Sequence, residues 1–388
     1  MNGKIWKKSL SRGFWALLLL VMLFGISTVP VWAEEFVIKG ESAVLMDGSS
    51  GSILFEQNAD KKWYPASVTK IMTLVLVLEA LESGKIKLDD KVTTSAEAAG
   101  MGGSQVYLYE GETRTVDEML VAVAVGSGND ASVAIAEHVG GSLAGFVDMM
   151  NEKAAKLGMS GSHFVNPHGL HDPDHYVTAR DMVILARHAT AVPRLLDYTS
   201  IYEYDFRPEP KPLKLWNTNR LLRWFDNCDG LKTGYTPEAK RNLVSTAKRD
   251  GMRLISVVLG VEEAKGHFNE SMRLLNYGFN KYAFQVVYEK GQDLGQVKVS
   301  KGVVDAIPLI LTEDVGMVIE KGSGGDIETR VDAPAILKAP LKKGDVAGTL
   351  IILREGIEMQ RVDILIQEDI PKSGFWRIVG KVFRAAGF

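Results

Sequence analysis

Apolar residues along this chain follow two different patterns, and the change between them divides the sequence near residue 284. Before that point, long apolar runs typical of helices lie between strand-like segments. After it, short segments of alternating apolar and polar residues continue to residue 370, separated by turn residues. The first part predicts an α+β fold with helices packed on an antiparallel sheet, and the second predicts a small all-β domain.

The elements of the first part follow from apolar periodicity, capping residues and turn residues. Strands are expected at 42–47, 52–56, 230–234, 243–247 and 252–259, and helices at 65–81, 116–125, 131–139, 143–157, 178–192 and 267–282. Loops are expected at 163–170 and after residue 207, where a Pro-rich passage begins. In the second part, strands are expected at 286–288, 295–299, 306–311, 315–319, 327–331, 349–353 and 360–365.

The N-terminus has the pattern of a secretory signal peptide. Four basic residues precede an apolar run from Phe14 to Ile26, and Val31-Trp32-Ala33 is a small-residue cleavage site. An uncleaved anchor is the alternative. Cleavage after Ala33 removes four positive charges and no negative ones, so the net charge moves from −3 to −7. Such an acidic protein is a poor general nucleic-acid binder, and we expect an exported protein without nucleic-acid partners.

The tail, residues 371–388, has the pattern of a basic amphipathic helix. Arg377, Lys381 and Arg384 form one basic stripe, and Trp376 and Phe383 are among the apolar residues beside it. A helix of roughly 16 residues reaches about 24 Å, which is short for a bilayer span. We therefore expect it to lie in the membrane interface, with docking on its own β domain as the alternative. The predicted domains are a signal peptide at 1–33, a catalytic domain at 35–283, an all-β spacer or docking domain at 284–370 and the tail helix.

The helix that begins near Pro65 carries the first candidate chemistry. It is apolar on every side and should be buried. Ser67 and Lys70 are three residues apart, so on a helix their side chains can meet. Burial lowers the pKa of a lysine, and such a lysine can accept the proton of a serine hydroxyl. This pattern predicts an activated serine nucleophile.

A Ser-x-x-Lys pattern alone is weak, and a second copy occurs at Ser245 to Lys248. That copy lies in the predicted hairpin. Residues three apart on a strand point to opposite faces, so Ser245 and Lys248 are not expected to act together. The secondary structure therefore favours the copy at Ser67.

Two further motifs complete the candidate site. Ser127-Gly128-Asn129 lies in a turn between two helices, where its hydroxyl and amide can relay a proton and hold a substrate carbonyl. Lys232-Thr233-Gly234 lies on a predicted edge strand, where Lys232 and Thr233 border a cleft and Gly234 lets a substrate backbone come close. A similar triplet, Lys372-Ser373-Gly374, falls outside the predicted catalytic domain.

In this order and in these contexts, the three motifs closely resemble those of the D-alanyl-D-alanine carboxypeptidases, which are low-molecular-mass penicillin-binding proteins. The resemblance covers 35–283 tightly and extends to the β domain and tail. It is carried by Tyr64–Thr73, Gly126–Ala131, Asn166–Leu170 and Gly230–Gly234. The fold that it implies is a penicillin-binding-protein/β-lactamase-like catalytic domain with a helical block on an antiparallel sheet.

The resemblance also implies a role for each site residue. Ser67 attacks the carbonyl between two terminal D-alanines, with Lys70 as general base, and water then hydrolyses the acyl-enzyme. The implied partners are peptidoglycan pentapeptides ending in D-Ala-D-Ala and β-lactam antibiotics, and no cofactor or metal is implied. Ser127 and Lys232 would carry the proton to the leaving group, Asn129 would hold the peptide carbonyl, Thr233 would bind the terminal carboxylate, and the N–H groups of Ser67 and Tyr235 would form the oxyanion hole.

Several residues in the predicted catalytic domain leave alternatives open. Tyr235 stands where relatives often have His, and Arg241 and His267 both remain candidates for a cation that binds the substrate carboxylate. Cys228 is the only cysteine, and it is either a small buried residue or a thiol near the site.

The histidines and aspartates of 163–175 raise the alternative of a zinc site. Pro173 lies between His171 and His175 and opposes a helix that would aim both at one ion, so loop-stabilising hydrogen bonds are the expectation.

For the whole protein, the rival functions are a β-lactamase, a transpeptidase and a non-catalytic cell-wall sensor.

Overall fold

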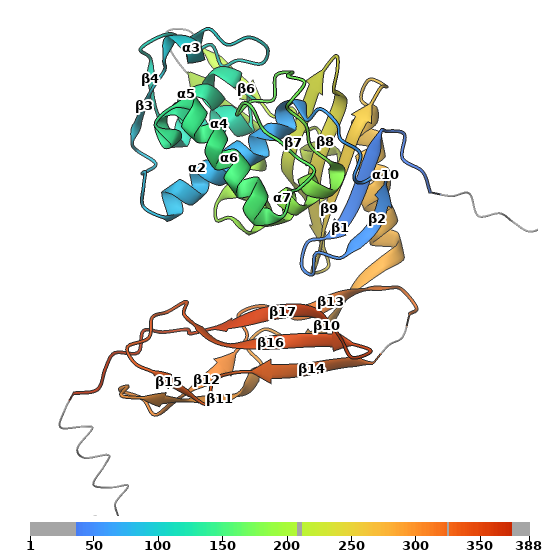
Figure 1. Ribbon diagram of the computed structural model, residues 1–388. Helices are drawn as coiled ribbons and strands as arrows, with labels where there is room; N and C mark the ends of the chain where they lie inside the picture. The colour runs from blue at the N-terminus through green and yellow to red at the C-terminus, as the bar shows by residue number, and fades with distance from the viewer. Residues whose placement is uncertain (1–35, 208–211, 324–325, 375–388) are drawn as a thin grey trace, which may run out of the picture. The chain divides into compact units, whose positions relative to one another are not determined.

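A computed structural model describes residues 36–207, 212–323 and 326–374 of the protein. The first part contains a five-stranded sheet in the order β2-β1-β9-β8-β7, with every neighbouring pair antiparallel (Figure 1). The antiparallel sheet predicted from the sequence is therefore confirmed. Its strands are β1 (Ser42–Asp47), β2 (Ile53–Gln57), β7 (Cys228–Thr236), β8 (Lys240–Arg249) and β9 (Met252–Val261).

Helices cover both faces of this sheet. The helical block lies on one face, and α10 (Gly266–Lys281) lies on the other (Figure 1). The block consists of α2 (Lys70–Glu82), α4 (Val116–Ala124), α5 (Asn129–Gly140), α6 (Leu143–Leu157) and α7 (Ala179–Ala191). Ten of the thirteen residues of α2 are buried, as an apolar run on every side of a helix predicts. This helix is thus the centre of the first part's core.

Local capping signals define the ends of several helices. Thr115 and Glu118 form a reciprocal capping box at the start of α4, and the Thr178 side chain accepts from Asp181 N–H at the start of α7. Gly158 follows α6 in a left-handed conformation. These ends agree with the sequence predictions to within about two residues.

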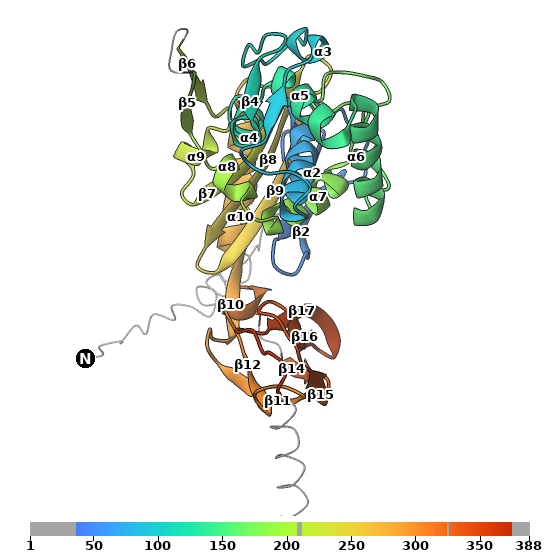
Figure 2. The same ribbon diagram turned by 90° about the vertical axis from the view of Figure 1, so that its left-hand side faces the viewer.

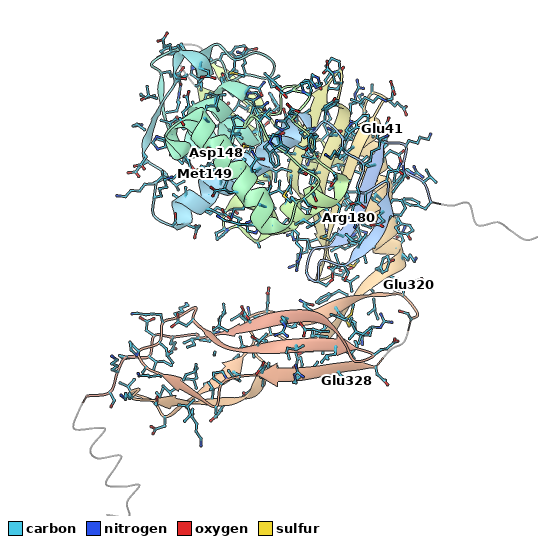
Figure 3. All side chains as sticks on the ribbon, viewed as in Figure 1. Glu41, Asp148, Met149, Arg180, Glu320 and Glu328 are labelled. Atoms are coloured by element: carbon cyan, nitrogen blue, oxygen red, sulfur yellow. The ribbon has the colours of Figure 1, made fainter. Side chains whose placement is uncertain are left out.

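Helix α7 is attached to the edge of the sheet by an ion-pair cluster. Arg180, at the beginning of α7, lies beside β2 (Figure 3). Its guanidinium is 3.0 Å from the Glu56 carboxylate and 2.6 Å from that of Asp60. Arg180 is partly exposed and both carboxylates are exposed, so the pairs add little stability and mainly define where α7 begins against the sheet.

The sequence patterns missed the short elements of the first part. These are α3 (Ala96–Ala99), α8 (Leu195–Thr199), α9 (Leu221–Trp224), the pair β3 (Lys91–Thr93) with β4 (Thr113–Thr115), and the pair β5 (Glu203–Arg207) with β6 (Leu213–Trp216). Strands of three to five residues carry too little alternation to be recognised. Residues 208–211, where the Pro-rich loop was predicted, lie outside the described residues.

The second part is all-β within the described residues, as predicted (Figure 2). Its small sheets have the orders β10-β13, β12-β11-β15 and β14-β16-β17, and β11 pairs with β15 in parallel. Buried aliphatic residues such as Val297, Leu350 and Ile364 form its core. Its strands are β10 (Tyr282–Tyr288), β11 (Asp293–Ser300), β12 (Ala306–Ile310), β13 (Val315–Glu320), β14 (Ile327–Asp332), β15 (Ile336–Lys338), β16 (Val346–Arg354) and β17 (Ile357–Leu365).

The predicted signal peptide and nearly all of the predicted tail helix lie outside the described residues. At the start of the tail, Lys372 pairs with Gly302 in an isolated β-bridge. Among the helices that the structure describes, none combines the length and the apolar character needed to cross a membrane.

Candidate active site

Ser67 and Lys70 meet where a short 3-10 turn leads into α2. The turn, η1 (Ala66–Thr69), carries Ser67, and Lys70 is the first residue of the α-helix, so the predicted helix begins as a 3-10 segment. Lys70 Nζ lies 3.0 Å from Ser67 Oγ. Ser67 is partly exposed, whereas Lys70 is fully buried. A substrate can therefore reach the hydroxyl, while the amine is shielded from water.

Two further acceptors surround the Lys70 amine. Asn129 Oδ1 and the carbonyl oxygen of His168 each lie 2.7 Å from Nζ. Burial lowers the pKa of Lys70 well below its usual range, and the charge of Lys232 lowers it further. A neutral amine has two N–H groups and one lone pair. In this neutral form the N–H groups can donate to the two oxygens, which leaves the lone pair for the Ser67 hydroxyl.

The Ser127–Asn129 motif lies where a turn leads into α5, with Asn129 as the first residue of the helix. Ser127 is buried and has a φ of 56°, in the left-handed region that few non-glycine residues adopt. Asn129 reaches Lys70 through Oδ1 and donates from Nδ2 to the carbonyl oxygen of Gly102 at 2.7 Å. The amide is thereby held in one orientation, and its second N–H remains the group that can bind a substrate carbonyl.

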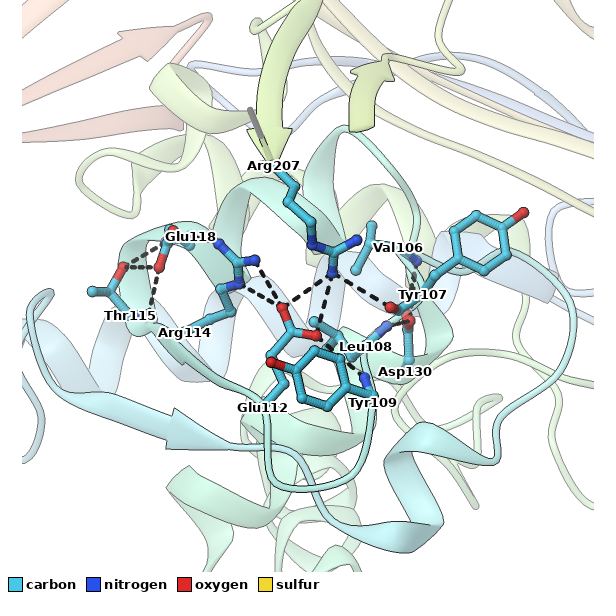
Figure 4. Close-up of polar contacts among 10 residues, drawn as sticks. All are labelled: Val106, Tyr107, Leu108, Tyr109, Glu112, Arg114, Thr115, Glu118, Asp130 and Arg207. Carbon is cyan, nitrogen blue, oxygen red and sulfur yellow. Dashed lines mark hydrogen bonds and ion pairs between the residues drawn. The ribbon is translucent and has the colours of Figure 1, made fainter. Parts of the chain in front are cut away.

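Two buried carboxylates hold the loop that precedes β4 (Figure 4). Asp130 accepts from the backbone N–H groups of Val106 and Leu108, each at 3.1 Å. Glu112 binds the Arg207 guanidinium at 3.0 Å. Sequence reasoning missed Asp130, although it directly follows the Ser-x-Asn motif. Its signal was a carboxylate at the first turn of a buried helix, where it accepts N–H groups from a loop.

A second loop, residues 166–170, lies against the turn that carries Ser67. Thr73 Oγ1 donates to the Pro167 carbonyl at 2.6 Å, which supports the neighbouring His168 carbonyl that faces Lys70. Gly169 has a φ of 87°, and a Cβ atom there would lie 1.8 Å from the Ala66 carbonyl oxygen. Only glycine allows this contact. The loop was predicted, but its direct role in the surroundings of Lys70 was not.

The third motif lies on β7, which is an edge strand as predicted. Lys232 is buried, and this burial lowers its pKa to about 7. Thr233 is partly exposed, and its hydroxyl lies 2.6 Å from that of Thr218, a residue that sequence reasoning missed. A Cβ atom on Gly234 would lie 2.7 Å from the Pro65 carbonyl oxygen and 3.0 Å from Ser67 N. Gly234 thus packs on the protein's own backbone, where the sequence analysis expected a substrate backbone.

The surroundings of Tyr235 distinguish between the two residues that were candidates for binding the substrate carboxylate. Arg241 lies opposite Tyr235 in the strand register, with its guanidinium 4.9 Å from the centre of the Tyr235 ring. His267 is mostly buried, and its pKa falls to about 4 through burial and through the charge of Arg241. His267 is therefore neutral at pH 7, and Arg241 is the one of the two that carries a positive charge there.

The competing motifs do not assemble into a second site. Ser245 is buried and lies 2.7 Å from the Ser256 hydroxyl, whereas Lys248 is exposed. This confirms that the two residues point to opposite faces of the strand.

Cys228 is half-buried, and burial raises the pKa of its thiol to about 12. It is therefore a protonated, unreactive thiol at neutral pH.

The histidines of 163–175 make local hydrogen bonds. His175 Nε2 lies 3.0 Å from Thr69 Oγ1, and His163 Nδ1 lies 2.7 Å from the Asp174 carbonyl oxygen. Within the described part of the chain, no group of His, Cys, Asp and Glu side chains is arranged to hold a metal ion. These imidazoles fasten the 163–175 segment to η1 and to itself.

Comparison with known proteins identifies the family. The family model described as D-alanyl-D-alanine carboxypeptidase matches residues 30–263, and the model for the C-terminal domain of penicillin-binding protein 5 matches residues 282–372. The chain belongs to the D-alanyl-D-alanine carboxypeptidase family. It is 40% identical over 345 residues to the D-alanyl-D-alanine carboxypeptidase DacF of Bacillus subtilis, covering 88% of each chain. The family resemblance inferred from the sequence is thus confirmed.

Solved structures of this family have the same fold. The crystal structure of penicillin-binding protein 5 from Haemophilus influenzae is 36% identical, with a TM-score of 0.67 over 87% of this chain and 99% of that one. Penicillin-binding protein D2 from Listeria monocytogenes, solved in its ampicillin-bound form, is 32% identical with a TM-score of 0.57 and covers 63% of this chain and 99% of its own. The predicted penicillin-binding-protein-like fold is therefore confirmed.

Proposed function

We propose that this protein is a serine-type, penicillin-sensitive D-Ala-D-Ala carboxypeptidase that removes the terminal D-alanine from peptidoglycan stem peptides. The observation that carries the proposal is the Lys70 amine. It is fully buried, lies 3.0 Å from Ser67 Oγ and has its two other contacts on fixed oxygen acceptors. The protein's membership of the carboxypeptidase family supports the same reaction.

In the acylation step, the Ser67 hydroxyl proton moves to the Lys70 lone pair as Oγ forms a bond to the carbonyl carbon of the penultimate D-alanine. The N–H groups of Ser67 and Tyr235 stabilise the oxyanion that results. When the C–N bond breaks, the leaving D-alanine nitrogen receives a proton through Ser127 and Lys232. The lowered pKa of Lys232, about 7, suits a group that gains and loses a proton near neutral pH.

The remaining motif residues position the substrate. Asn129 has one amide N–H available for the peptide carbonyl, and the Thr233 hydroxyl binds the terminal carboxylate from the edge of β7. Arg241 supplies the nearby positive charge. Water then attacks the ester carbonyl and gives up a proton to Lys70. As the bond between Ser67 Oγ and the acyl carbon breaks, Lys70 returns this proton to Oγ, which releases the shortened peptide and restores Ser67 and the neutral amine. β-Lactams enter the same path and acylate Ser67.

D-alanine release tests this proposal directly. The mature protein and Ser67→Ala are compared on an acyl peptide ending in D-Ala-D-Ala, and both are checked for folding. We expect release by the wild type and a loss of at least 10³-fold in the variant, because the nucleophile is absent. Labelled penicillin should attach to the wild type alone. A folded wild-type protein that releases no D-alanine would refute the carboxypeptidase function.

The same experiment separates the rival functions. Rapid penicillin hydrolysis would indicate a β-lactamase. Transfer of the acyl group to an added amine with little hydrolysis would indicate a transpeptidase, the name given to a Streptomyces K15 enzyme that is 28% identical. Stable penicillin labelling without turnover of either substrate would favour the cell-wall sensor.

The domain and localisation proposals complete this function. We propose a signal peptide at 1–33, a catalytic domain at 35–283, an all-β domain at 284–370 and an amphipathic tail at 371–388 that holds the exported protein on the outer face of the cytoplasmic membrane. The basic stripe of the tail suits anionic lipid. Removal of residues 371–388 should move the protein from the membrane fraction to the soluble fraction, and unchanged membrane association would contradict the anchor.

A further inference from the structure

A buried asparagine on β8 lies directly behind the turn that carries the nucleophile. Asn242 is fully buried, and each polar atom of its amide has a partner. Nδ2 lies 2.9 Å from the Tyr64 carbonyl oxygen and 2.8 Å from the Pro65 carbonyl oxygen. Oδ1 accepts from Gly260 N–H at 2.8 Å. The contact with Gly260 determines which end of the amide is oxygen, so both N–H groups face the two carbonyls.

Asn242 also lies beside the strand residue that touches Ser67. It is paired with Gly234 in the register of β7 and β8. Gly234 packs so closely on the turn that an added Cβ would lie 3.0 Å from the backbone nitrogens of both Ser67 and Val68. Two neighbouring positions in the sheet therefore hold the same turn: Gly234 lets it pack closely against β7, and Asn242 binds its carbonyl groups.

The turn needs such an anchor because its backbone is strained. Ala66, between the bound carbonyls and Ser67, has a φ of 48°. A left-handed non-glycine residue persists only where its surroundings determine the conformation. Ahead of the turn, Trp63 Nε1 donates to the Ala239 carbonyl at 2.8 Å, which attaches the entering chain to the same end of the sheet. Of these two attachments, the one made by Asn242 lies nearer to Ser67 along the chain, because it holds the carbonyls of Tyr64 and Pro65.

We propose that Asn242 is a positioning residue for the oxyanion hole. It holds the Tyr64 and Pro65 carbonyls so that Ser67 N–H stays at a fixed separation from Tyr235 N–H, which belongs to the strand beside it. This inference rests on the proposed function, in which those two N–H groups stabilise the transition state. Donors of this kind act through preorganisation, so a small displacement affects the reaction more than it affects substrate binding.

Asn242→Asp is the sharpest variant. It keeps the size of the side chain and the acceptor for Gly260 N–H, but it replaces the two N–H donors with a carboxylate oxygen facing two carbonyl oxygens. Gln57→Glu is the matched control. Gln57 Nε2 also donates to two carbonyls, those of Ile38 and Gly40, and its Oε1 accepts from Ile38 N–H. It lies on β2, at the opposite edge of the same sheet from β7.

The measurements are kcat and KM for D-alanine release, the rate of Ser67 acylation by benzylpenicillin and the midpoint of thermal unfolding. We expect Asn242→Asp to lower kcat and the acylation rate by 10- to 100-fold, with KM changed less than about 3-fold. Gln57→Glu, at a partly buried position, should lower the unfolding midpoint and leave both rates within about 2-fold. Asn242→Ser, which retains one donor, should have intermediate rates.

Equal rate losses in Asn242→Asp and Gln57→Glu would overturn the proposal, because the effect would then follow general destabilisation. A raised KM with unchanged kcat would also overturn it. If Asn242→Asp does not fold, Asn242→Ser is judged by the same criteria against Gln57→Glu. Penicillin acylation reports on Ser67 without turnover, so failure of the wild type to release D-alanine would refute the proposed function and still leave the effect of Asn242 measurable.

Discussion

Gly169 offers the most direct test of how the 166–170 loop supports the Lys70 amine. A Cβ atom at this position would lie 1.8 Å from the Ala66 carbonyl oxygen, 2.4 Å from the Ala66 carbonyl carbon and 2.8 Å from Thr69 Oγ1. Non-bonded contacts of Cβ atoms below 3.0 Å are essentially never observed. In Gly169→Ala, the loop must therefore move away from the η1 turn by more than about 1 Å.

The cost of this substitution has two parts. A non-glycine residue at a φ of 87° loses roughly 1–2 kcal/mol. Relief of the clash with the Ala66 carbonyl adds about 1–3 kcal/mol, which is typical of an overpacked site. We expect Gly169→Ala to lower the free energy of unfolding by about 3 kcal/mol, which corresponds to roughly 6–12 °C in Tm for a domain of this size.

The substitution should also slow the reaction. The His168 carbonyl precedes Gly169 and accepts from Lys70 Nζ at 2.7 Å. When the loop retreats, this contact lengthens and the amine loses one of the two acceptors that direct its lone pair at Ser67. A displacement of about 1 Å in a positioned group can reduce a rate by about 10²-fold. We expect a loss of this order in Ser67 acylation by benzylpenicillin.

Gly158→Ala is the control for backbone conformation alone. Gly158 has a φ of 77°, and no atom lies within 4 Å of the position that its Cβ would occupy. It should lose about 1 kcal/mol and retain the wild-type acylation rate. Thermal unfolding and stopped-flow acylation of both variants compare the two effects. If Gly169→Ala is no less stable than Gly158→Ala and acylates at the same rate, the close contact between the loop and the η1 turn is refuted.

Three further predictions concern titratable groups. Lys70→Gln shortens the side chain by one atom and cannot accept a proton, so D-alanine release should fall by about 10³-fold, and more than about a tenth of wild-type activity would exclude Lys70 as the base. Lys232 has a pKa of about 7 in the folded protein, below that of the unfolded chain, so the unfolded chain binds more protons between pH 7 and about 10. The free energy of unfolding therefore rises with pH in this window. Urea unfolding should show that the wild type gains about 2–3 kcal/mol more than Lys232→Met between pH 7 and 9. The same pH dependence of the unfolding free energy in both proteins would contradict this pKa. The pKa of Cys228, about 12, predicts that iodoacetamide at pH 8 alkylates the folded protein at least about 10²-fold more slowly than the unfolded chain, and equal rates would contradict the burial of the thiol.

The sequence determined the secondary structure wherever a local pattern was long enough. Helix α2 is apolar on all sides, and Thr115 and Thr178 cap their helices through contacts within three residues. The same local reasoning separated Ser67 from Ser245, since residues three apart meet at the start of a helix and diverge on a strand. Short elements such as β3 and β5 were missed because three to five residues carry too little periodicity.

The contacts that define the chemistry of the site were decided by the tertiary structure. Lys70 meets Asn129 and His168, which are 59 and 98 residues away in the chain. No local pattern encodes these distances, because they depend on how α5 and the 166–170 loop pack against α2. The role of Asn242 could not be predicted from the sequence for the same reason, since its partners Tyr64 and Pro65 belong to a segment more than 170 residues away.

The role of Gly234 and the state of the two lysines illustrate this division. The sequence showed that a glycine follows Thr233, but the fold determined that its missing Cβ makes room for the Ser67 turn. The sequence likewise supplied Lys70 and Lys232. Both pKa values are lowered because distant segments exclude water from the two amines, and the charge of Lys232 lowers the pKa of Lys70 further. Residue identity and local spacing are properties of the sequence, whereas desolvation is a property of the packed fold.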